Sequence, residues 1–390
     1  MNSNYIYHNA DNSYKIKPKN TYFPKNLKEI IDIVKNNSNR KIRVSSSIHT
    51  FNDMSICDDI IIRLSNLKNI LNMNHEKKTV LVEAGILLYI FVQELEKYNL
   101  ALQVSPDCMW QSLGGAISTS THGSRIDRGS LSDSIISITM ILYNGIVINI
   151  KKGDKMFPAA TVSLGTLGII YLIELQCEEL YYIEETQIKM KWNEFIKNIY
   201  KILKNNTYTQ LIVNPKDKTC NILVRKKIEI KDKINIIKEK IYFNVISELE
   251  ESNPYTEIEI TIPIKYLDEA INEIFILYEN NINFNTLLIR FVGINKNSFI
   301  GMSSDRKYNA TISIFGEAKN SSNHKLLNLF EKFQKTLLKY KGRPHYGKKL
   351  FLNKKEMKKL YPKLQKFIDV RNELDPHKIF TNDYIKRLLD

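Results

Sequence analysis

The first chemically suggestive feature is a short run of hydroxyl residues that ends in a histidine. The segment 45–50 reads Ser-Ser-Ser-Ile-His-Thr and directly follows a predicted strand at 41–44. Successive backbone N–H groups in such a turn form a concavity for anions, and the hydroxyl groups add further donors. His49 would then lie beside the molecule that carries the phosphates. On its own, the segment also fits a solvated serine-rich turn with a surface histidine.

A second stretch, residues 111–124, combines two adjacent glycines, six hydroxyl residues and a histidine. Small residues let the backbone approach a flat ligand closely, and the hydroxyl groups can bond its polar edge. A flexible glycine-serine loop is the alternative, but the strands predicted directly after this stretch disfavour a pure linker. The glycines of a third segment, 164–170, predict close backbone packing against a helix or a ligand.

The elements that must position these segments alternate between helix and strand over the first hundred residues. Apolar spacing predicts helices at 27–34 and 87–98. Strands are predicted at 41–44, 60–64, 79–83, 134–143 and 146–150, the last two joined by an Asn-Gly hairpin turn. This order is typical of an α/β or α+β fold.

The later chain has longer helical patterns with intervening strands. Helices are predicted at 192–203, 228–242, 264–277 and 326–337, and strands at 210–213, 257–262, 286–292 and 309–314. We therefore predict a first domain at 1–178 and a second, α+β domain at 179–390.

Composition disfavours several classes of protein. The 390 residues contain no apolar run long enough to span a membrane, and the polar N-terminus lacks the apolar core of a secretory signal. The four cysteines, Cys57, Cys108, Cys177 and Cys220, form no CxxC pair, which argues against a zinc site or a disulfide framework. We expect no metal site and a location in the cytoplasm or another reducing compartment. The net charge of +15 comes from lysines interleaved with acids, so a nucleic-acid surface is not expected.

Six segments in order resemble one family. They are the turn ending in His49, Val82–Gly85, Gly114–Gly123, Leu164–Ile170, Gly342–Lys348 and Asp375–Asn382. Together they are similar to the aldonolactone oxidases, the group that includes L-gulonolactone oxidase and D-arabinono-lactone oxidase. That group belongs to the flavoproteins of the vanillyl-alcohol-oxidase type. The resemblance runs from about residue 24 to about residue 389 and is thin between residues 181 and 280.

The resemblance implies an α+β fold with a two-subdomain FAD-binding domain of the PCMH type, a substrate domain that caps the flavin, and a C-terminal segment that returns to the flavin site. It places the FAD pyrophosphate on the turn 45–50, and His49 where the family can carry a covalent bond to the flavin. The residues that it implies for FAD binding are Ser45, Ser46, Ser47, Ile48, His49, Thr50, Gly114, Gly115, Ser118, Thr119, Thr121, His122, Gly123, Gly168, Ile170 and Asn382. The residues that it implies at the substrate are Arg290, Lys348 and His345.

Two parts of the pattern differ in this chain. Ser46 and Ile48 stand where the family's phosphate turn usually has glycines. A β-branched residue tolerates positive φ poorly. Either the turn is built without positive φ at these places, or it binds the pyrophosphate less well.

The second difference concerns Arg290, which follows Leu287, Leu288 and Ile289 in an apolar run. An unpaired buried charge is costly, so this arginine must be paired, face a cavity, or point to solvent. The family typically has a glutamate two residues before the arginine, and Leu288 takes that place on the same strand face. The acid that would balance Arg290 or orient a substrate hydroxyl is therefore expected to be missing.

The function that the resemblance implies is oxidation of a CH–OH group of a sugar lactone or related polyol. Hydride would pass to FAD, and oxygen would be reduced to hydrogen peroxide. One alternative is a flavin dehydrogenase of the same fold that uses another acceptor or a different carbohydrate. Another is a non-enzymatic flavin-fold binding protein, which Ile48 and Leu288 favour and which His49, Lys348 and Arg290 disfavour. The oligomeric state stays open.

Overall fold

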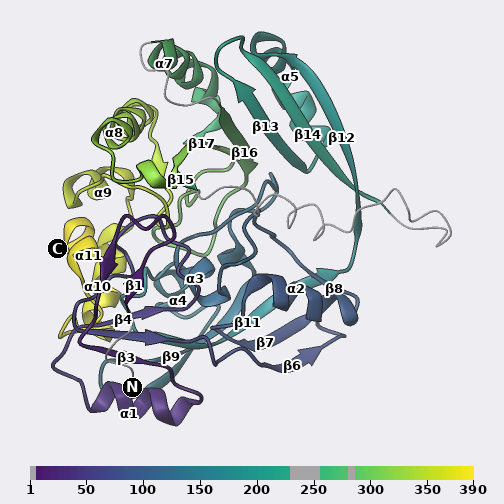
Figure 1. Ribbon diagram of the computed structural model, residues 1–390. Helices are drawn as coiled ribbons and strands as arrows, with labels where there is room; N and C mark the ends of the chain where they lie inside the picture. The colour runs from purple at the N-terminus through teal and green to yellow at the C-terminus, as the bar shows by residue number, and fades with distance from the viewer. Residues whose placement is uncertain (1–5, 229–254, 280–285) are drawn as a thin grey trace.

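The computed structural model describes residues 6–228, 255–279 and 286–390. Figure 1 shows an N-terminal part built on two sheets, a second part built on one larger sheet, and C-terminal helices that return beside the N-terminal strands. Two large hydrophobic cores correspond to these parts. Within the described residues, no helix combines the length and apolar character needed to cross a membrane.

The N-terminal part contains a parallel three-stranded sheet and a separate six-stranded sheet. The parallel sheet has the order β3 (Asn20–Tyr22), β5 (Ile60–Arg63) and β4 (Ile42–Ser45). The antiparallel sheet has the order β10 (Val147–Lys151), β9 (Ile135–Ile141), β11 (Ile169–Glu179), β7 (Thr79–Glu83) and β6 (Ile70–Asn74), and β8 (Leu100–Leu102) also pairs with β11. A small hairpin joins β1 (Tyr7–His8) to β2 (Lys15–Ile16). The helices are α1 (Leu27–Lys35), α2 (Leu88–Lys97), α3 (Leu113–Ser118) and α4 (Phe157–Ala160), with a 3₁₀ turn at Leu131–Ser134.

The second part is one antiparallel sheet. Helices pack against one of its two faces, here called the helix-covered face. Its order is β12 (Tyr182–Lys191), β14 (Thr219–Ile228), β13 (Tyr208–Asn214), β16 (Leu287–Val292), β17 (Asn309–Glu317), β15 (Tyr255–Pro263) and β18 (Arg343–Pro344). The core under that face includes residues from α5 (Trp192–Asn205), α7 (Leu267–Glu279) and α8 (His324–Leu338). Short 3₁₀ turns lie at Ile264–Tyr266 and Ala318–Asn320.

Period-two alternation decides which residues of this sheet face the first part. On β16, Leu287 and Ile289 enter the core under the helices. Leu288 and Arg290 point to the opposite face, where they line a cavity. The same alternation on β15 places isoleucines in the core and Glu257 on the cavity side. The face of this sheet that carries no helices therefore forms one wall of the cavity.

The C-terminal segment returns to the first core. It contains α9 (Lys354–Leu360), α10 (Leu364–Leu374) and α11 (Asp383–Leu389), and apolar side chains from residues 346–389 belong to the same core as β4, β7 and β9. The expected return of the C-terminus is thus seen as packing against the N-terminal part. The predicted domain boundary at 178/179 falls at the end of β11.

Most of the predicted elements are present within a few residues of their expected bounds. The strand at 79–83 is exact, and the predicted helix at 192–203 is α5 with two more residues. The sequence patterns missed several elements, among them β6, β8, β12, β14 and the short helix α3. The helix predicted at 228–242 lies outside the described residues, apart from residue 228, which ends β14.

Arg43 on β4 connects three distant segments of the chain. Its guanidinium donates hydrogen bonds to the carbonyls of Met54 (3.0 Å), Leu164 (2.9 Å), Gly165 (2.9 Å) and Phe380 (2.7 Å). Arg43 is 2% exposed, and burial lowers its pKa to about 10, which leaves it charged at neutral pH. One buried cation therefore holds the loop after β4, the loop before β11 and the C-terminal segment together.

Replacing Arg43 should destabilise the whole first core. Arg43→Met removes all four hydrogen bonds and leaves buried carbonyls unpaired, so we expect the free energy of unfolding to fall by roughly 3–5 kcal/mol. Arg43→Lys, which keeps the charge but not the branched donors, should give a smaller loss. Urea denaturation measures both variants, and a stability of Arg43→Met equal to that of the native chain would contradict this role.

Candidate active site

A cavity of about 450 Å³ lies between the two parts of the molecule. Its walls come from the hydroxyl-rich turn, α3, the segment before β11, the open face of the second sheet and the loop after β18. The lining includes these predicted site residues: Ser45, Ser46, Ser47, Ile48, His49, Thr50, Gly114, Gly115, Ser118, Thr119, Thr121, His122, Gly168, Ile170, Arg290, His345 and Lys348. Segments far apart in the sequence therefore meet at one site.

Two predicted residues do not line the cavity. Gly123 lies behind His122, whose Nδ1 faces the Gly123 carbonyl at 2.9 Å. Asn382 caps the first turn of α11, and its side-chain amide donates to three carbonyls of the loop 53–56. Asn382 thus supports the wall from behind and does not reach the cavity.

The turn 46–50 has the character of an anion site. Within the described residues, none of its backbone N–H groups donates to a protein acceptor, although the turn borders the cavity. Unpaired N–H groups of this kind favour a phosphate group. The donor set therefore fits the pyrophosphate of a dinucleotide cofactor.

Ile48 adopts the positive φ that its side chain disfavours. Its φ is +63°, so the alternative of a turn built without positive φ is wrong at this position. The residue packs against Tyr7, Cys57 and Ile61, a small core beneath the turn. A left-handed conformation costs a non-glycine residue about 1–2 kcal/mol. This apolar packing offsets the strain, which explains how an isoleucine can occupy the turn.

Close packing at α3 explains one of the adjacent glycines. A Cβ atom on Gly114 would lie 3.0 Å from both the Cβ and the carbonyl oxygen of Ala84. The hydroxyls of Ser118 and Thr119 donate back to the carbonyls of Gly114 (2.7 Å) and Gly115 (3.1 Å). These two hydroxyl groups thus donate to carbonyls of their own helical segment. Toward the cavity, their small side chains leave room for a ligand to approach closely.

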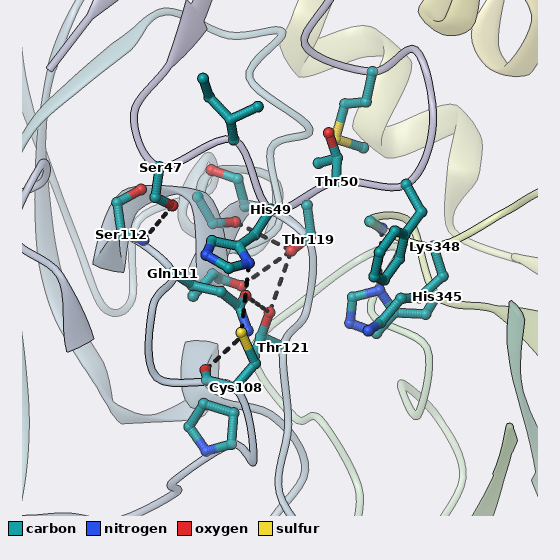
Figure 2. Close-up of a pocket in the computed structure, with 18 of the residues that line it drawn as sticks. Ser47, His49, Thr50, Cys108, Gln111, Ser112, Thr119, Thr121, His345 and Lys348 are labelled. Atoms are coloured by element: carbon teal, nitrogen blue, oxygen red, sulfur yellow. Dashed lines mark hydrogen bonds between the residues drawn. The ribbon is translucent and has the colours of Figure 1, made fainter. Parts of the chain in front are cut away.

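His49 projects into the cavity from the end of the turn (Figure 2). Burial, with a smaller contribution from the charge of Lys348, lowers the pKa of His49 to about 4. The ring is therefore neutral at pH 7 and keeps a nitrogen lone pair. The Sγ atom of Cys108 lies 3.6 Å from its Nδ1.

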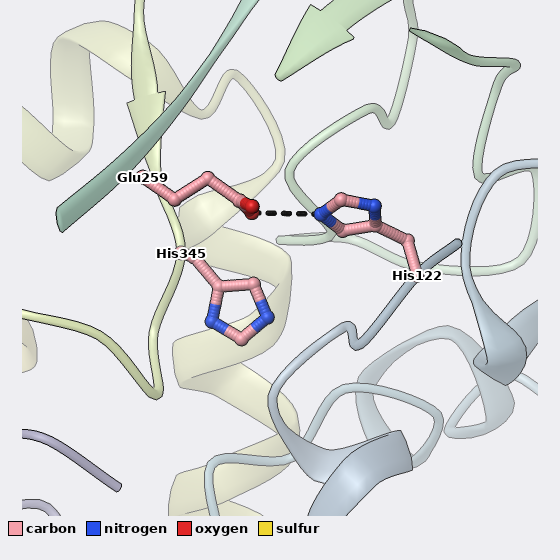
Figure 3. Close-up of side chains that lie close together, drawn as sticks. All are labelled: His122, Glu259 and His345. Carbon is pink, nitrogen blue, oxygen red and sulfur yellow. Dashed lines mark hydrogen bonds and ion pairs between the residues drawn. The ribbon is translucent and has the colours of Figure 1, made fainter. Parts of the chain in front are cut away.

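Glu259 is the centre of a buried charged network (Figure 3). One oxygen of this carboxylate lies 2.7 Å from His122 Nε2, and the other accepts from Arg290 and, at 3.1 Å, from the Ser313 hydroxyl. Both nitrogens of His122 face oxygens, Glu259 on one side and Gly123 on the other, so the ring must donate on both sides. Burial opposes the charge on Glu259, but His122 and Arg290 together hold the pKa of Glu259 well below its usual value.

His122, Glu259 and His345 offer donor atoms within 4.8 Å of one another, a spacing that suits a metal ion. Both oxygens of Glu259 already accept hydrogen bonds, and the neighbouring Arg290 adds positive charge. His345 uses its Nδ1 to accept the Gly347 N–H at 3.0 Å, which puts the proton of the neutral ring on Nε2. We therefore interpret the cluster as a charge-balanced hydrogen-bond network.

Two cations face the cavity from the second part of the molecule. Burial disfavours the charge of Arg290, but Glu259 and Asp107 more than offset this and raise its pKa. Burial likewise opposes the charge of Lys348, and its ion pair with Glu257, at 2.5 Å, raises its pKa. Both side chains are therefore cations at neutral pH.

His345 lies beside these cations and behaves differently. Burial lowers its pKa to about 3, so the ring is neutral over the physiological range. With its proton on Nε2, the ring is a hydrogen-bond donor toward the network and a poor general base.

The expectation that Arg290 lacks an acidic partner is wrong. Leu288 does line the cavity, but Glu259 reaches Arg290 from two strands away. Leu288 pairs with Ser313 on β17, and Ser313 pairs with Glu259 on β15. The carboxylate thus stands in the same cross-strand row as Leu288, displaced by two strands.

Sequence reasoning missed several lining residues, namely Asp107, Cys108, Gln210, Glu257 and the supporting Glu259. The two glutamates carried a readable signal, because they alternate with isoleucines in the strand predicted at 257–262. Gln210 is the first residue of the strand predicted at 210–213, and its side-chain oxygen is buried without a partner among the described residues. Polar residues on one face of a predicted strand were therefore the signal in the sequence for this wall of the cavity.

Comparisons with known proteins match two parts of the chain to two families. Residues 18–151 match the family described as FAD binding domain, and residues 249–388 match the family described as D-arabinono-1,4-lactone oxidase. The first match identifies the part that carries the hydroxyl-rich turn and α3 as an FAD-binding domain.

Whole-chain relatives agree with these matches. The chain is similar to L-gulonolactone oxidase of Mus musculus, at 23% identity over 98% of this chain and 98% of that protein. It is also similar to L-gulono-1,4-lactone dehydrogenase of Mycobacterium tuberculosis, at 23% identity over 94% and 95% of the two chains. Among solved structures, cholesterol oxidase from B. sterolicum aligns with a TM-score of 0.81 at 14% identity, covering 99% of this chain and 96% of that one. This likeness confirms the fold, and the FAD-binding domain within it is identified by the family match to residues 18–151.

Removing the charge of Glu259 should weaken the contact between the two parts of the molecule. Glu259→Gln removes the buried charge that pairs with Arg290 and the acceptor that faces His122, so we expect a loss of about 3–5 kcal/mol of unfolding free energy at pH 7. Because the folded pKa of Glu259 is lowered, its stabilising effect is complete above the unfolded value of 4.5 and disappears as the pH falls below it.

The difference between Glu259→Gln and the native chain should therefore shrink in acid. Urea denaturation from pH 7 down to pH 3 measures it. Glu331→Gln, which removes an exposed ion pair with Lys335, is the control and should cost less than about 1 kcal/mol. A Glu259→Gln loss that is equally small, or that is independent of pH, would contradict the account.

Proposed function

Because the chain belongs to the aldonolactone oxidase family, we propose that it is an FAD-dependent enzyme that oxidises a CH–OH group of a sugar lactone or related polyol, with oxygen as the electron acceptor. The observation that carries this proposal is the composition of the cavity. One wall is an anion-binding turn with a neutral histidine, and the opposite wall presents Arg290 and Lys348. A cofactor and a polar substrate can thus be held face to face.

FAD, when bound, accepts the hydrogen and electron pair that leave the substrate carbon. The turn 46–50 binds the cofactor's pyrophosphate through its backbone N–H groups, and the small residues of α3 allow a flat ring to approach. These residues hold and orient the cofactor, and the second sheet covers it.

Arg290 and Lys348 stabilise the negative charge that develops on the substrate oxygen as its hydroxyl loses a proton. Both cations are pre-oriented by carboxylates, Arg290 by Asp107 at 2.7 Å and Lys348 by Glu257. His345 adds a neutral N–H donor beside them. The two cations are therefore already in position before the substrate binds, and no charged side chain has to move.

Polar and apolar groups share the substrate wall. Gln210 and Arg290 each have one buried polar atom without a partner among the described residues, the Oε1 and Nε atoms, and pairing them with a substrate hydroxyl would be favourable. Ile212, Leu223 and Leu288 line the same wall. The wall therefore suits a compact ring that offers hydroxyl groups on one part and C–H surface on another, as a sugar lactone does.

Turnover of aldonolactones by the purified protein tests the proposal. We expect L-gulono-1,4-lactone or D-arabinono-1,4-lactone to consume oxygen and release an equal amount of hydrogen peroxide, measured with an oxygen electrode and a peroxide assay. The matching open-chain aldonate is the control and should react poorly. Lactone oxidation with an added dye, but without peroxide, would indicate a dehydrogenase instead. No oxidation of any lactone with either acceptor would contradict the function.

We also propose that the flavin is covalently attached to His49. The neutral ring with a free lone pair, at the cavity end of the turn, supports this role. After acid precipitation, the yellow colour should stay with the pellet, and mass spectrometry of its peptides should find the flavin mass on the peptide that contains His49. The peptide that contains His345, the neighbouring cavity histidine, should be unmodified. Complete release of flavin into the supernatant would refute covalent attachment.

A further inference from the structure

The cavity-facing side of the second sheet carries a line of apolar side chains. Five neighbouring strands of this sheet, β14, β13, β16, β17 and β15, each place one such side chain at the cavity (Figure 1). In that order across the sheet they are Leu223, Ile212, Leu288, Phe315 and Tyr255, here called the apolar strip. Neighbouring strands lie about 4.8 Å apart, so the strip crosses about 19 Å of sheet. A single lactone ring covers only part of this length.

Strand register makes the apolar strip continuous. Ile212 on β13 stands directly opposite Leu288 on β16. Leu288 in turn pairs with Ser313 on β17, and Phe315 is the next residue of β17 on the same face. The ring centroid of Phe315 lies 5.7 Å from that of Tyr255. The member of the strip on β14 is a diagonal neighbour of Ile212, within contact range across adjacent strands.

Polarity changes along each strand that contributes to the strip. On four of the strands, the strip residue lies two positions from a buried polar residue, on the same face. The four pairs are Gln210 and Ile212, Arg290 and Leu288, Ser313 and Phe315, and Glu257 and Tyr255. Because adjacent strands are antiparallel, all four steps point in the same direction across the sheet. The polar residues are at most 7% exposed, whereas Ile212 and Tyr255 are each 37% exposed. The cavity is therefore polar at its inner end and apolar toward its mouth.

This gradient does not match a molecule that is hydroxylated along its whole length. A free sugar lactone carries a hydroxyl group on almost every carbon outside the ester. Four of the five side chains of the apolar strip contain no polar atom. A hydroxyl group placed against them would lose its hydrogen bonds to water without replacement, which is unfavourable. The mouth of the cavity therefore suits a part of the substrate that has no hydroxyl groups.

We propose that the substrate is a sugar lactone or polyol that carries an acyl or alkyl chain at the end remote from the oxidised CH–OH group. This inference rests on the proposed function and names the substrate class within it. The hydroxylated part lies at the inner end, against Arg290 and Lys348, and the chain lies across the apolar strip. Burial of the chain against the strip removes apolar surface from water and so adds binding energy.

A matched pair of substrates tests this inference. L-gulono-1,4-lactone and its 6-O-octanoyl ester differ only in the chain on the remote primary hydroxyl group. We expect a KM for the ester at least about 10-fold lower than that for the free lactone, with a similar kcat, because the chain contacts the protein equally before and during the reaction. An ester KM equal to or above that of the free lactone would overturn the inference, while turnover of the free lactone would leave the proposed function intact.

Variants of the strip locate the effect. Ile212→Asn and Leu288→Asn each place a polar group in the strip and should bring the ratio of the two KM values close to one. The ratio is taken within each variant, so a general change in the site cancels. Ile146→Asn is the control, because Ile146 is 55% exposed in the turn between β9 and β10, and it should keep the native ratio. A native ratio in both strip variants would overturn the inference. Loss of flavin from these variants at an unchanged ratio would also overturn it, since the strip would then cover the cofactor.

Calorimetric titration separates chain binding from the chemistry. The protein is titrated with the octanoyl ester without oxygen, after its flavin has been reduced with dithionite, so that no turnover occurs. The native protein should bind the ester at least about 10-fold more tightly than Ile212→Asn does. This result in a protein that oxidises no lactone would support the apolar strip and refute the proposed function alone. Equal binding by the two proteins, or no binding by either, would overturn the role of the strip.

Discussion

A single buried carboxylate determines how the two parts of this molecule meet. Glu259 is completely buried and can remain charged only because His122 from the first part and Arg290 from the second both contact it. Taking a carboxylate out of water costs several kcal/mol, which its partners must offset. The network therefore constrains the second sheet to one position over the cavity. The same contacts hold Arg290 in place at the cavity wall.

The hydroxyl-rich turn on the opposite wall of the cavity contains one residue with a strained backbone. Ile48 keeps a left-handed conformation, and the small core that holds its side chain offsets the cost. Strained residues of this kind cluster at functional sites, where the surrounding structure enforces them. The turn can thus leave its N–H groups directed at a ligand without glycine. A preformed anion site and a preformed cation wall together define what the cavity can bind.

Local patterns predicted most elements and singled out two segments that line the cavity, because apolar periodicity and small-residue clusters depend on neighbours in the chain. They failed where a contact depends on the order of strands. The partner of Arg290 was expected two residues away and is found on β15, since β17 lies between β15 and β16. Local patterns also gave no sign that Cys108 lies beside His49, because hydrogen bonds between segments about 60 residues apart bring them together. Asn382 resembled a cofactor ligand, yet it supports a loop behind the cavity.

Reduction of the bound flavin by a lactone is the central claim, and an anaerobic titration tests it most directly. The absorption bands of the oxidised flavin should bleach when an aldonolactone is added to the purified protein without oxygen. They should return when air is admitted, which would also establish oxygen as an acceptor. Bands that stay unchanged at every lactone concentration would show that the cavity holds a flavin without carrying out this oxidation.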